Sequence, residues 1–195
     1  MSDARLDAHD IVARARVAAG ADGRLPLGGI QTWGNFPYDG DIRLRELADV
    51  ELPEPPRADV DPADCSACAR PDGDFLWLDD NWRVSSNSRG RSLPLFILGT
   101  RAHFDLDELP AALQGELGPT MIRLERAIAS IDGVARVHID RWGDGAHHLH
   151  LFFYARPAGM PQLKGLFMPS WLDSLPPLPD HVAHAIEAQV AAALN

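Results

Sequence analysis

The chain has 195 residues, 46% of them hydrophobic, and its 28 acidic and 18 basic side chains give a net charge of −10. A chain of this length buries roughly 70% of its unfolded surface, so we expect one core that needs no disulfide and leaves the two cysteines free for other chemistry. The acidic balance argues against binding to duplex nucleic acid, which needs a basic face, but it permits small phosphorylated ligands held by a few arginines.

Residues 1–64 are predicted to lie outside the main domain. Residues 3–19 place apolar side chains at helical spacing, so a short N-terminal helix is expected. Residues 25–38 are rich in Gly and Pro but contain aromatic side chains, which favours an irregular arm whose aromatic groups pack on the domain. Residues 51–64 combine prolines with acidic residues, a composition typical of a linker.

The main domain is predicted to span residues 65–157 and to begin with three strands. Residues 74–86 have the pattern of two short strands joined by a polar turn. The nearly continuous apolar run at 92–99 is typical of a central strand. Together these segments predict an antiparallel meander.

A long helix is predicted after the central strand. Its apolar residues recur every three or four positions up to Asp132, and Asp105 or Asp107 is expected to cap its start. Pro119 lies inside this pattern and lacks the N–H that a helix interior uses, so we expect it to kink or interrupt the helix.

Two further strands are predicted at 134–142 and 148–156, separated by a glycine-containing loop. Residues 158–195 then comprise a Pro-rich segment and a C-terminal helix at 180–194. The order of strands, helix, strands and helix predicts an α+β domain. It is expected to have an antiparallel sheet, one long helix after the central strand, an N-terminal arm and a C-terminal helix.

The last predicted strand has an informative alternation. Successive side chains of a strand point to opposite faces, so His148, His150, Phe152 and Tyr154 are expected to share one face. Two histidines at this spacing have Cα atoms about 6.5 to 7 Å apart, which suits two adjoining functions rather than a direct hydrogen bond. The alternative is a strand edge with two solvated imidazoles.

Cys65 and Cys68 form a Cys-x-x-Cys turn just before the first strand. Such a turn can supply half of a tetrahedral zinc site, and because the chain has no other cysteine, histidines must complete it. His103 and His148 are the natural candidates. A redox pair and two buried thiols are the alternatives, and the redox pair is disfavoured because no strand precedes the turn.

These motifs together resemble the histidine triad superfamily, which contains nucleotide hydrolases and galactose-1-phosphate uridylyltransferases. The resemblance covers residues 65–157 and is carried by the Cys-x-x-Cys turn, the apolar strand before His103, the following helix, and the sequence HLHLFFYARP at 148–157. It implies a histidine triad-like sheet, with His150 as the nucleophile that attacks a phosphate. It also implies a structural zinc ion held by Cys65, Cys68, His103 and His148.

His150 suits this role chemically, because a neutral imidazole is nucleophilic near pH 7. A backbone carbonyl is expected to accept a hydrogen bond from its other ring nitrogen and so select the tautomer. The candidate substrate-binding residues are Arg156, which matches an Arg-Pro pair of the superfamily, and three residues at or before the loop that precedes the motif. These three are Arg141, Asp144 and Gly145.

The sequence departs from the superfamily pattern at two positions. Phe152 stands where the third histidine is expected, and Ala146 stands where a hydroxyl side chain is usual, so two hydrogen-bond donors are missing. One reading is a hydrolase or nucleotidyltransferase for nucleotides or nucleoside phosphates, and the other is a catalytically silent nucleotide-binding or interaction module. Zinc-activated water is a weaker option, because two cysteines and two histidines close the tetrahedron.

The expected partners follow from the same features. The chain has no apolar run of about 18 residues and its N-terminal residues are too polar for a signal peptide, so we expect a cytoplasmic protein with no membrane partner and no duplex nucleic acid. A nucleotide or nucleoside-phosphate ligand is expected. A homodimer is left open, since superfamily members often pair.

Overall fold

The computed structural model describes residues 7–26, 28–46 and 48–195, and it divides the chain into two compact units, Met1–Pro55 and Pro56–Asn195. The first unit contains helix α1 (Ala8–Ala18), whose start is capped by the Asp7 carboxylate accepting a hydrogen bond from the His9 N–H. This helix lies within the predicted range 3–19, of which residues 3–6 are outside the described part. The expected packing of the arm on the domain stays a prediction.

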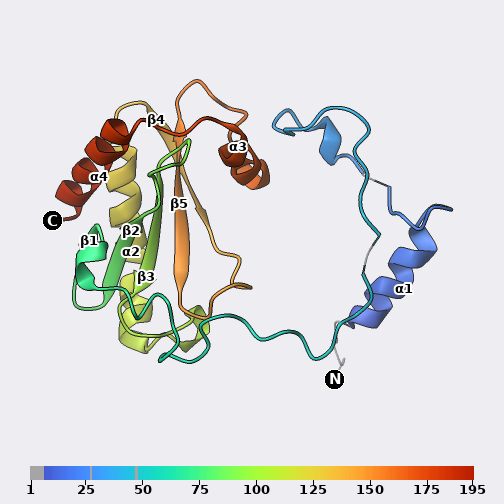
Figure 1. Ribbon diagram of the computed structural model, residues 1–195, viewed down its shortest axis with the longest axis horizontal. Coiled ribbons are helices and arrows are strands. Elements are labelled where there is room, and N and C mark those ends of the chain that lie inside the picture. Colours follow the sequence, from blue (N-terminus) through green and yellow to red (C-terminus); the bar gives the residue numbers. More distant parts are fainter. Residues whose placement is uncertain (1–6, 27, 47) are drawn as a thin grey trace. The chain divides into compact units, whose positions relative to one another are not determined.

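The second unit is built on a five-stranded antiparallel sheet with the strand order β1-β2-β3-β5-β4 (Figure 1). The predicted strands are present, and the first is short because a 3-10 turn ends at Asp74 and residues 75–76 form a bend. The strands are β1 (Trp77–Leu78), β2 (Trp82–Ser86), β3 (Leu95–Thr100), β4 (Val134–Asp140) and β5 (His150–Pro157).

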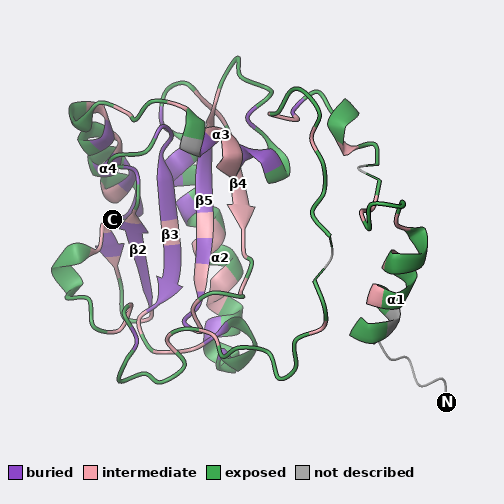
Figure 2. Cartoon of the chain, turned by 45° about the vertical axis from the view of Figure 1, so that its right-hand side comes forward, coloured by how far each residue is buried: buried purple, intermediate pink, exposed green. Residues whose placement is uncertain are grey.

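One face of the sheet forms the main core with helices α2 (Ala111–Ala129) and α4 (Asp180–Leu194). Buried residues concentrate in β2, β3 and β5 (Figure 2). Alternate residues of these strands, such as Trp82, Leu98 and Phe153, pack against apolar residues of both helices. The predicted α+β class, the long helix after the central strand and the C-terminal helix are therefore confirmed. No helix among the described residues is long and apolar enough to cross a membrane.

The opposite face of the sheet is covered by a helix at one end. Helix α3 (Met168–Ser174) packs there against Leu95 and Tyr154, in a second apolar cluster. Because Leu95 pairs with Tyr154 and Gly99 pairs with His150 in the register of β3 and β5, the same face continues toward His150. His150 therefore lies beyond the part of this face that α3 covers.

The structure differs from the expected long helix at its start, and it excludes an interruption at Pro119. Asp105 caps a separate 3-10 turn (Leu106–Glu108), and α2 begins at Ala111, directly after Pro110. Pro119 does not interrupt α2, which is continuous across it. Pro119 is exposed, whereas buried residues before and after it, including Leu113 and Leu124, hold both halves of the helix against the sheet. Burial of this face outweighs the one missing hydrogen bond.

A buried carboxylate fastens α4 to the end of β2. Glu187 is 7% exposed, and its Oε2 atom accepts hydrogen bonds from Nη2 and Nε of Arg89 at 2.9 and 3.2 Å. Burial by itself raises the pKa of Glu187, but the bonds from Arg89 and Ser86 outweigh it and hold that pKa below the ordinary 4.5. The folded state therefore favours the ionised carboxylate.

We expect Glu187→Gln to lower the free energy of unfolding by about 1 kcal/mol at pH 7, since a hydrogen bond to a charged group is lost and Arg89 is well solvated. Because the folded pKa lies below the unfolded one, the stabilisation is complete above pH 4.5 and is lost as the pH falls through the folded pKa. Urea unfolding between pH 7 and pH 4 tests this, with the exposed Glu125→Gln on α2 as control. A constant difference across that range would contradict it.

Candidate functional site

Cys65, Cys68, His103 and His148 come together into one cluster, in which the four candidate ligand atoms lie within 4.8 Å of one another. Cys65 Sγ lies 3.4 Å from His148 Nδ1, and Cys68 Sγ lies 3.4 and 3.5 Å from Nδ1 of His148 and of His103. Around a tetrahedral ion with the bond lengths of zinc, sulfur and nitrogen ligands are about 3.6 Å apart. The cluster is thus a candidate metal site whose geometry suits a four-coordinate ion.

Local hydrogen bonds shape the cysteine turn. The Cys68 N–H donates to Cys65 Sγ at 3.4 Å, and the Ala69 N–H donates to the Cys65 carbonyl at 3.0 Å. Asp59 accepts hydrogen bonds from the backbone N–H and the hydroxyl of Ser66, which fixes the middle of the turn. Burial, followed by the neighbouring Cys65 thiol, raises the pKa of Cys68. Two ionised thiols at this position therefore require a cation.

His148 is oriented by the strand beside it. Its Nε2 atom lies 2.8 Å from the Thr100 carbonyl, so the ring proton is placed on Nε2 and Nδ1 keeps its lone pair toward the sulfur atoms. The side chain is buried, with 3% of the residue exposed, and burial lowers the pKa of His148. Both features favour the neutral ring that metal ligation requires.

His103 is backed by a second imidazole and a carboxylate. Its Nε2 atom lies 3.4 Å from Nδ1 of His147, and Nε2 of His147 lies 3.5 Å from a Glu108 carboxylate oxygen. The two rings stack with their centroids 5.5 Å apart. A group that contacts the second nitrogen of a metal-binding imidazole orients the ring. Here His147 is that group for His103, and Glu108 contacts His147 from the other side.

We expect His147→Ala to weaken metal binding by about 10- to 100-fold while the fold is kept, because His103 loses the group that orients it. Competition with a coloured chelator measures the affinity of the purified protein for zinc. His181→Ala, an exposed histidine on α4, is the matched control. Equal affinities for both variants would show that His103 needs no such support.

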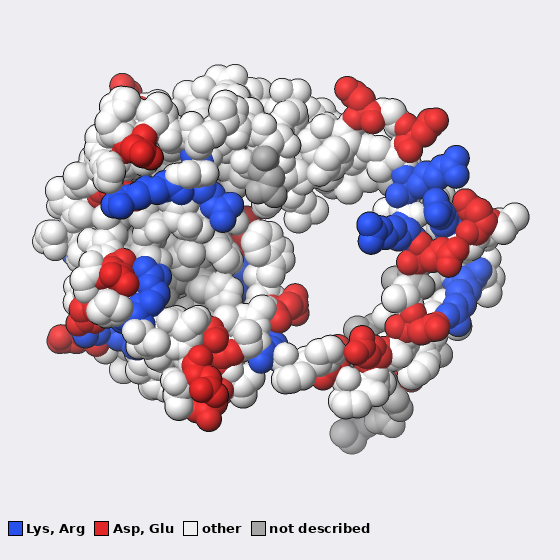
Figure 3. All heavy atoms as spheres, in the orientation of Figure 1, with Lys and Arg blue, Asp and Glu red and all other residues white. Residues whose placement is uncertain are grey.

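His150 is held in a single tautomer. Its Nδ1 atom donates a hydrogen bond to the His148 carbonyl at 2.8 Å, the kind of bond expected from the sequence. The proton is therefore on Nδ1, and Nε2 carries the lone pair. The ring lines a cavity of about 210 Å³ on the face of the sheet opposite to the main core. Figure 3 shows a hollow on this side of the second unit, with basic side chains on both sides of it.

The floor of this cavity is a row of three residues from neighbouring strands. Arg83 of β2 pairs with Gly99 of β3, which in turn pairs with His150 of β5, so all three face the same side of the sheet. A Cβ atom at Gly99 would lie 2.8 Å from the Leu149 carbonyl oxygen, a distance too short for a side chain. No side chain therefore separates Arg83 from His150.

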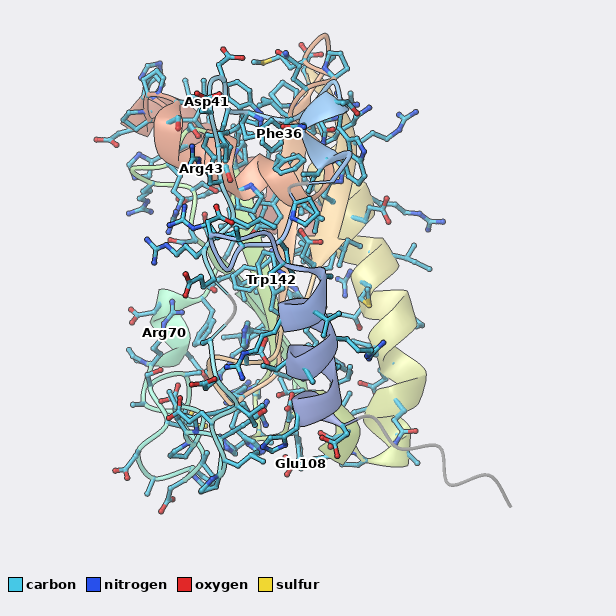
Figure 4. All side chains as sticks on the ribbon, turned by 90° about the vertical axis from the view of Figure 1, so that its right-hand side faces the viewer. Phe36, Asp41, Arg43, Arg70, Glu108 and Trp142 are labelled. Carbon is cyan, nitrogen blue, oxygen red and sulfur yellow. The ribbon has the colours of Figure 1, made fainter. Side chains whose placement is uncertain are left out.

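Arg83 and Arg70 were not identified as candidate site residues from the sequence. Arg83 is 7% exposed, its Nη2 atom lies 3.0 Å from His148 Nε2, and its guanidinium lies 4.6 Å from the centre of the Phe75 ring. Arg70 lies over the same ring at 4.5 Å, in the segment before β1 (Figure 4). The signal for Arg83 was its position between the core residues Trp82 and Val84, where a charged side chain must face the other side of the strand.

The comparisons with known proteins identify the fold. No family model and no curated protein matches the sequence. A histidine triad protein of known structure from Bradyrhizobium japonicum is 16% identical, and the match covers 62% of this chain and 90% of that one with a TM-score of 0.51. This chain has the histidine triad fold.

Two further solved structures are similar at lower scores. A histidine triad protein from Marinobacter aquaeolei VT8 is 22% identical over 62% of this chain and 87% of its own, with a TM-score of 0.49. A zinc-bound histidine triad family protein from Mycobacterium smegmatis is 18% identical over 62% and 82%, with a TM-score of 0.43. The similarity to the Bradyrhizobium japonicum structure confirms the fold expected from the motifs, whereas the relation to the zinc-containing branch and to the uridylyltransferases stays a prediction.

Within this histidine triad fold, the predicted substrate-binding residues do not line the cavity beside His150. Arg156 lies six positions further along β5 and donates to the carbonyls of Pro157 and Met160. Asp144 and Gly145 are in an exposed loop, where the Gly145 carbonyl accepts a hydrogen bond from the Ala58 N–H.

Arg141 is engaged elsewhere. It donates to the buried carboxylate of Asp105, which also accepts a hydrogen bond from Arg57 at 2.7 Å. Burial raises the pKa of Asp105, but the bonds from the two arginines outweigh it and lower that pKa to about 2. Arg57 also donates to the Gly143 carbonyl at 2.7 Å. These bonds join the predicted linker to the loop before the motif and engage the Arg141 guanidinium in an ion pair.

The position of the third histidine is apolar. The Phe152 ring lies edge-on to the His150 ring, 5.3 Å away, and 5.8 Å from the Trp142 ring. Tyr154 continues this row along β5, with its ring centre 6.1 Å from that of Phe152. The alternation therefore predicted correctly that one face carries His150, Phe152 and Tyr154. The Phe152 side chain has no hydrogen-bond donor to offer beside His150.

Proposed function

We propose that this protein binds a nucleotide or nucleoside phosphate beside His150 and hydrolyses it, or transfers its nucleotidyl group, with His150 as nucleophile and a structural zinc ion at the cysteine and histidine cluster. The observation that carries the proposal is the bond from His150 Nδ1 to the His148 carbonyl. It leaves the Nε2 lone pair available in a side chain that lines a cavity. The histidine triad fold supports the proposed chemistry by analogy only.

The reaction proceeds in two displacements. Nε2 of His150 forms a bond to phosphorus while the bond from phosphorus to the leaving group breaks, and the leaving atom takes the electron pair. Water then attacks phosphorus, the N–P bond breaks, and its electron pair returns to Nε2. The hydroxyl of that water stays on phosphorus and its proton passes to the departed group. In a transferase, an acceptor hydroxyl or phosphate replaces the water.

The four-residue cluster supports this chemistry from behind the nucleophile. A bound zinc ion would tie the turn of Cys65 and Cys68 to His103 and His148 without contacting the substrate, since four protein ligands complete its coordination. His148 thereby keeps its backbone carbonyl in position to accept the His150 hydrogen bond. The proposed role of the cluster is preorganisation of His150.

Phe152 narrows the class of substrate. It cannot give a proton to a leaving group, so a group that departs as a stable anion has an advantage over one that must be protonated. Phosphoric anhydrides, such as dinucleoside polyphosphates and nucleotide sugars, meet this condition, whereas the amine of a phosphoramidate does not. We expect anhydrides to be the better substrates.

The test is product formation from these three substrate classes by the zinc-loaded protein, followed by chromatography. The second candidate is a silent module that binds nucleotides without turning them over, and Phe152 together with Ala146 favours it. Loss of one donor aimed at developing charge costs about 10²- to 10³-fold in rate, so two losses can reduce turnover to background. Nucleotide binding without product would select this candidate.

A further inference from the structure

Arg83 carries a buried positive charge that the described residues do not neutralise. Its exposed fraction is 7%, and its guanidinium contacts a histidine nitrogen, the Cys68 thiol and the face of Phe75, with no carboxylate among these partners. An isolated buried charge is costly, and native proteins pair such groups. The buried arginine therefore lacks an anion.

The cysteine and histidine cluster does not supply that anion. The thiols of Cys68 and Cys65 are close enough to Arg83 to affect its pKa, but two thiolates are balanced by a divalent ion when the site is filled. His148 gives its Nε2 proton to the Thr100 carbonyl, so it is not an acceptor for Arg83 in that state. The donors of Arg83 are then available for another partner.

The position of Arg83 in the sheet shows where that partner fits. Neighbouring strands are about 4.8 Å apart, so the Cα atoms of Arg83 and His150, two strands apart, are separated by about 10 Å. Gly99 lies between them and contributes no side chain. Both side chains line the same cavity, which leaves space above Gly99 for a tetrahedral anion.

We propose that Arg83 binds the phosphoryl group that His150 attacks. Its guanidinium presents paired N–H donors that match two phosphate oxygens. The positions of Phe152 in β5 and of Ala146 in the preceding loop lack side-chain hydrogen-bond donors. Arg83 would supply donors and a positive charge from β2 instead. This proposal rests on the proposed function for the identity of the ligand, a phosphate ester or anhydride, but its test does not require turnover.

The experiment compares the affinities of the zinc-loaded full chain for orthophosphate, AMP and adenosine by calorimetry. Wild type is expected to bind AMP more tightly than adenosine, and Arg83→Met is expected to weaken AMP and orthophosphate binding by about 10- to 100-fold without affecting adenosine. Arg136→Met removes the same charge from an exposed position on β4 and is the control. Zinc content and melting temperature verify that each variant is folded.

A second variant covers the case in which Arg83→Met does not fold. Ser85 is buried two positions along β2, on the same face as Arg83. The Ser85→Asp variant therefore places a carboxylate where it can form an ion pair with the Arg83 guanidinium. It retains Arg83 and is expected to abolish the preference for AMP over adenosine. Undiminished AMP binding in the folded Arg83→Met variant, or in Ser85→Asp if the former does not fold, would overturn the proposal.

The outcomes separate this inference from the proposed function. If wild type turns substrate over and Arg83→Met binds AMP as tightly as wild type does, the proposed reaction stands and the proposed role of Arg83 is wrong. Phosphate binding that depends on Arg83, without any turnover, keeps Arg83 and selects the silent module. A wild-type protein that binds AMP no more tightly than adenosine, and binds no orthophosphate, overturns the anion site.

Discussion

Replacing His150 with alanine is expected to reduce turnover of a nucleotide anhydride by about 10⁴-fold or more, because the group that forms the covalent intermediate is removed. The zinc content is expected to stay unchanged, since the His150 side chain contributes no ligand atom to the cluster. Steady-state kinetics and metal analysis on the same samples measure both effects. Wild type trapped during turnover is expected to carry a nucleotidyl group on His150, detectable by mass spectrometry.

The control is His181→Ala on α4, which removes an exposed imidazole far along the chain from the motif. It is expected to match wild type in rate and in metal content. If His150→Ala turns substrate over as fast as this control does, His150 is not the nucleophile. If neither wild type nor variant forms product but both bind AMP, the silent module is correct.

Cys65→Ser is expected to lower the free energy of unfolding by about 3 to 5 kcal/mol, a fraction of the roughly 10 to 16 kcal/mol that zinc contributes in small zinc-dependent domains. The fraction is smaller here because the sheet and two helices have a core of their own. Cys65 is 1% exposed, so water cannot reach the metal in place of the lost thiolate unless the turn opens. Urea unfolding with and without a chelator measures the effect.

Ser66→Ala is the matched control, because it alters the same turn but leaves all four candidate ligands in place. Purified wild type and this control are both expected to contain close to one zinc ion per chain and to lose stability on chelation. Chelation is expected to leave Cys65→Ser nearly unchanged. A wild-type protein that contains no metal and is insensitive to chelators would show that the cluster is a set of buried thiols and imidazoles.

Local patterns were sufficient to predict the elements of the domain. The alternation after Ala146 placed His150, Phe152 and Tyr154 on one face, and the rings do follow one another along β5. Such a pattern is local because the side-chain period of a strand is a property of the backbone. The start of α2 was missed for a different reason. Asp105 has the residue type of a helix cap, but its carboxylate caps a short 3-10 turn and binds two arginines from distant segments.

The candidate ligands Cys65, Cys68, His103 and His148 were also predicted from residue type, spacing and resemblance, and the structure brings them together. Their second layer was not predicted. His147 lies behind His103 because the loop before β5 turns its side chain in that direction, and Glu108 reaches it from a 3-10 turn. Contacts of this kind depend on where two distant loops meet.

By itself, the sequence determined the five strands, the long and the C-terminal helices, the faces of β5 and the residue types able to hold a metal ion, because these depend on spacing within short segments. It did not reveal helix α3, which lies in the predicted Pro-rich segment. Only the tertiary structure decided which arginine side chains are available to a ligand beside His150. Arg141 is paired with Asp105, whereas Arg83 faces His150 across Gly99. The physical reason is register: the pairing of β2, β3 and β5 joins residues up to about 70 positions apart, and a shift of one residue would turn Arg83 to the opposite face.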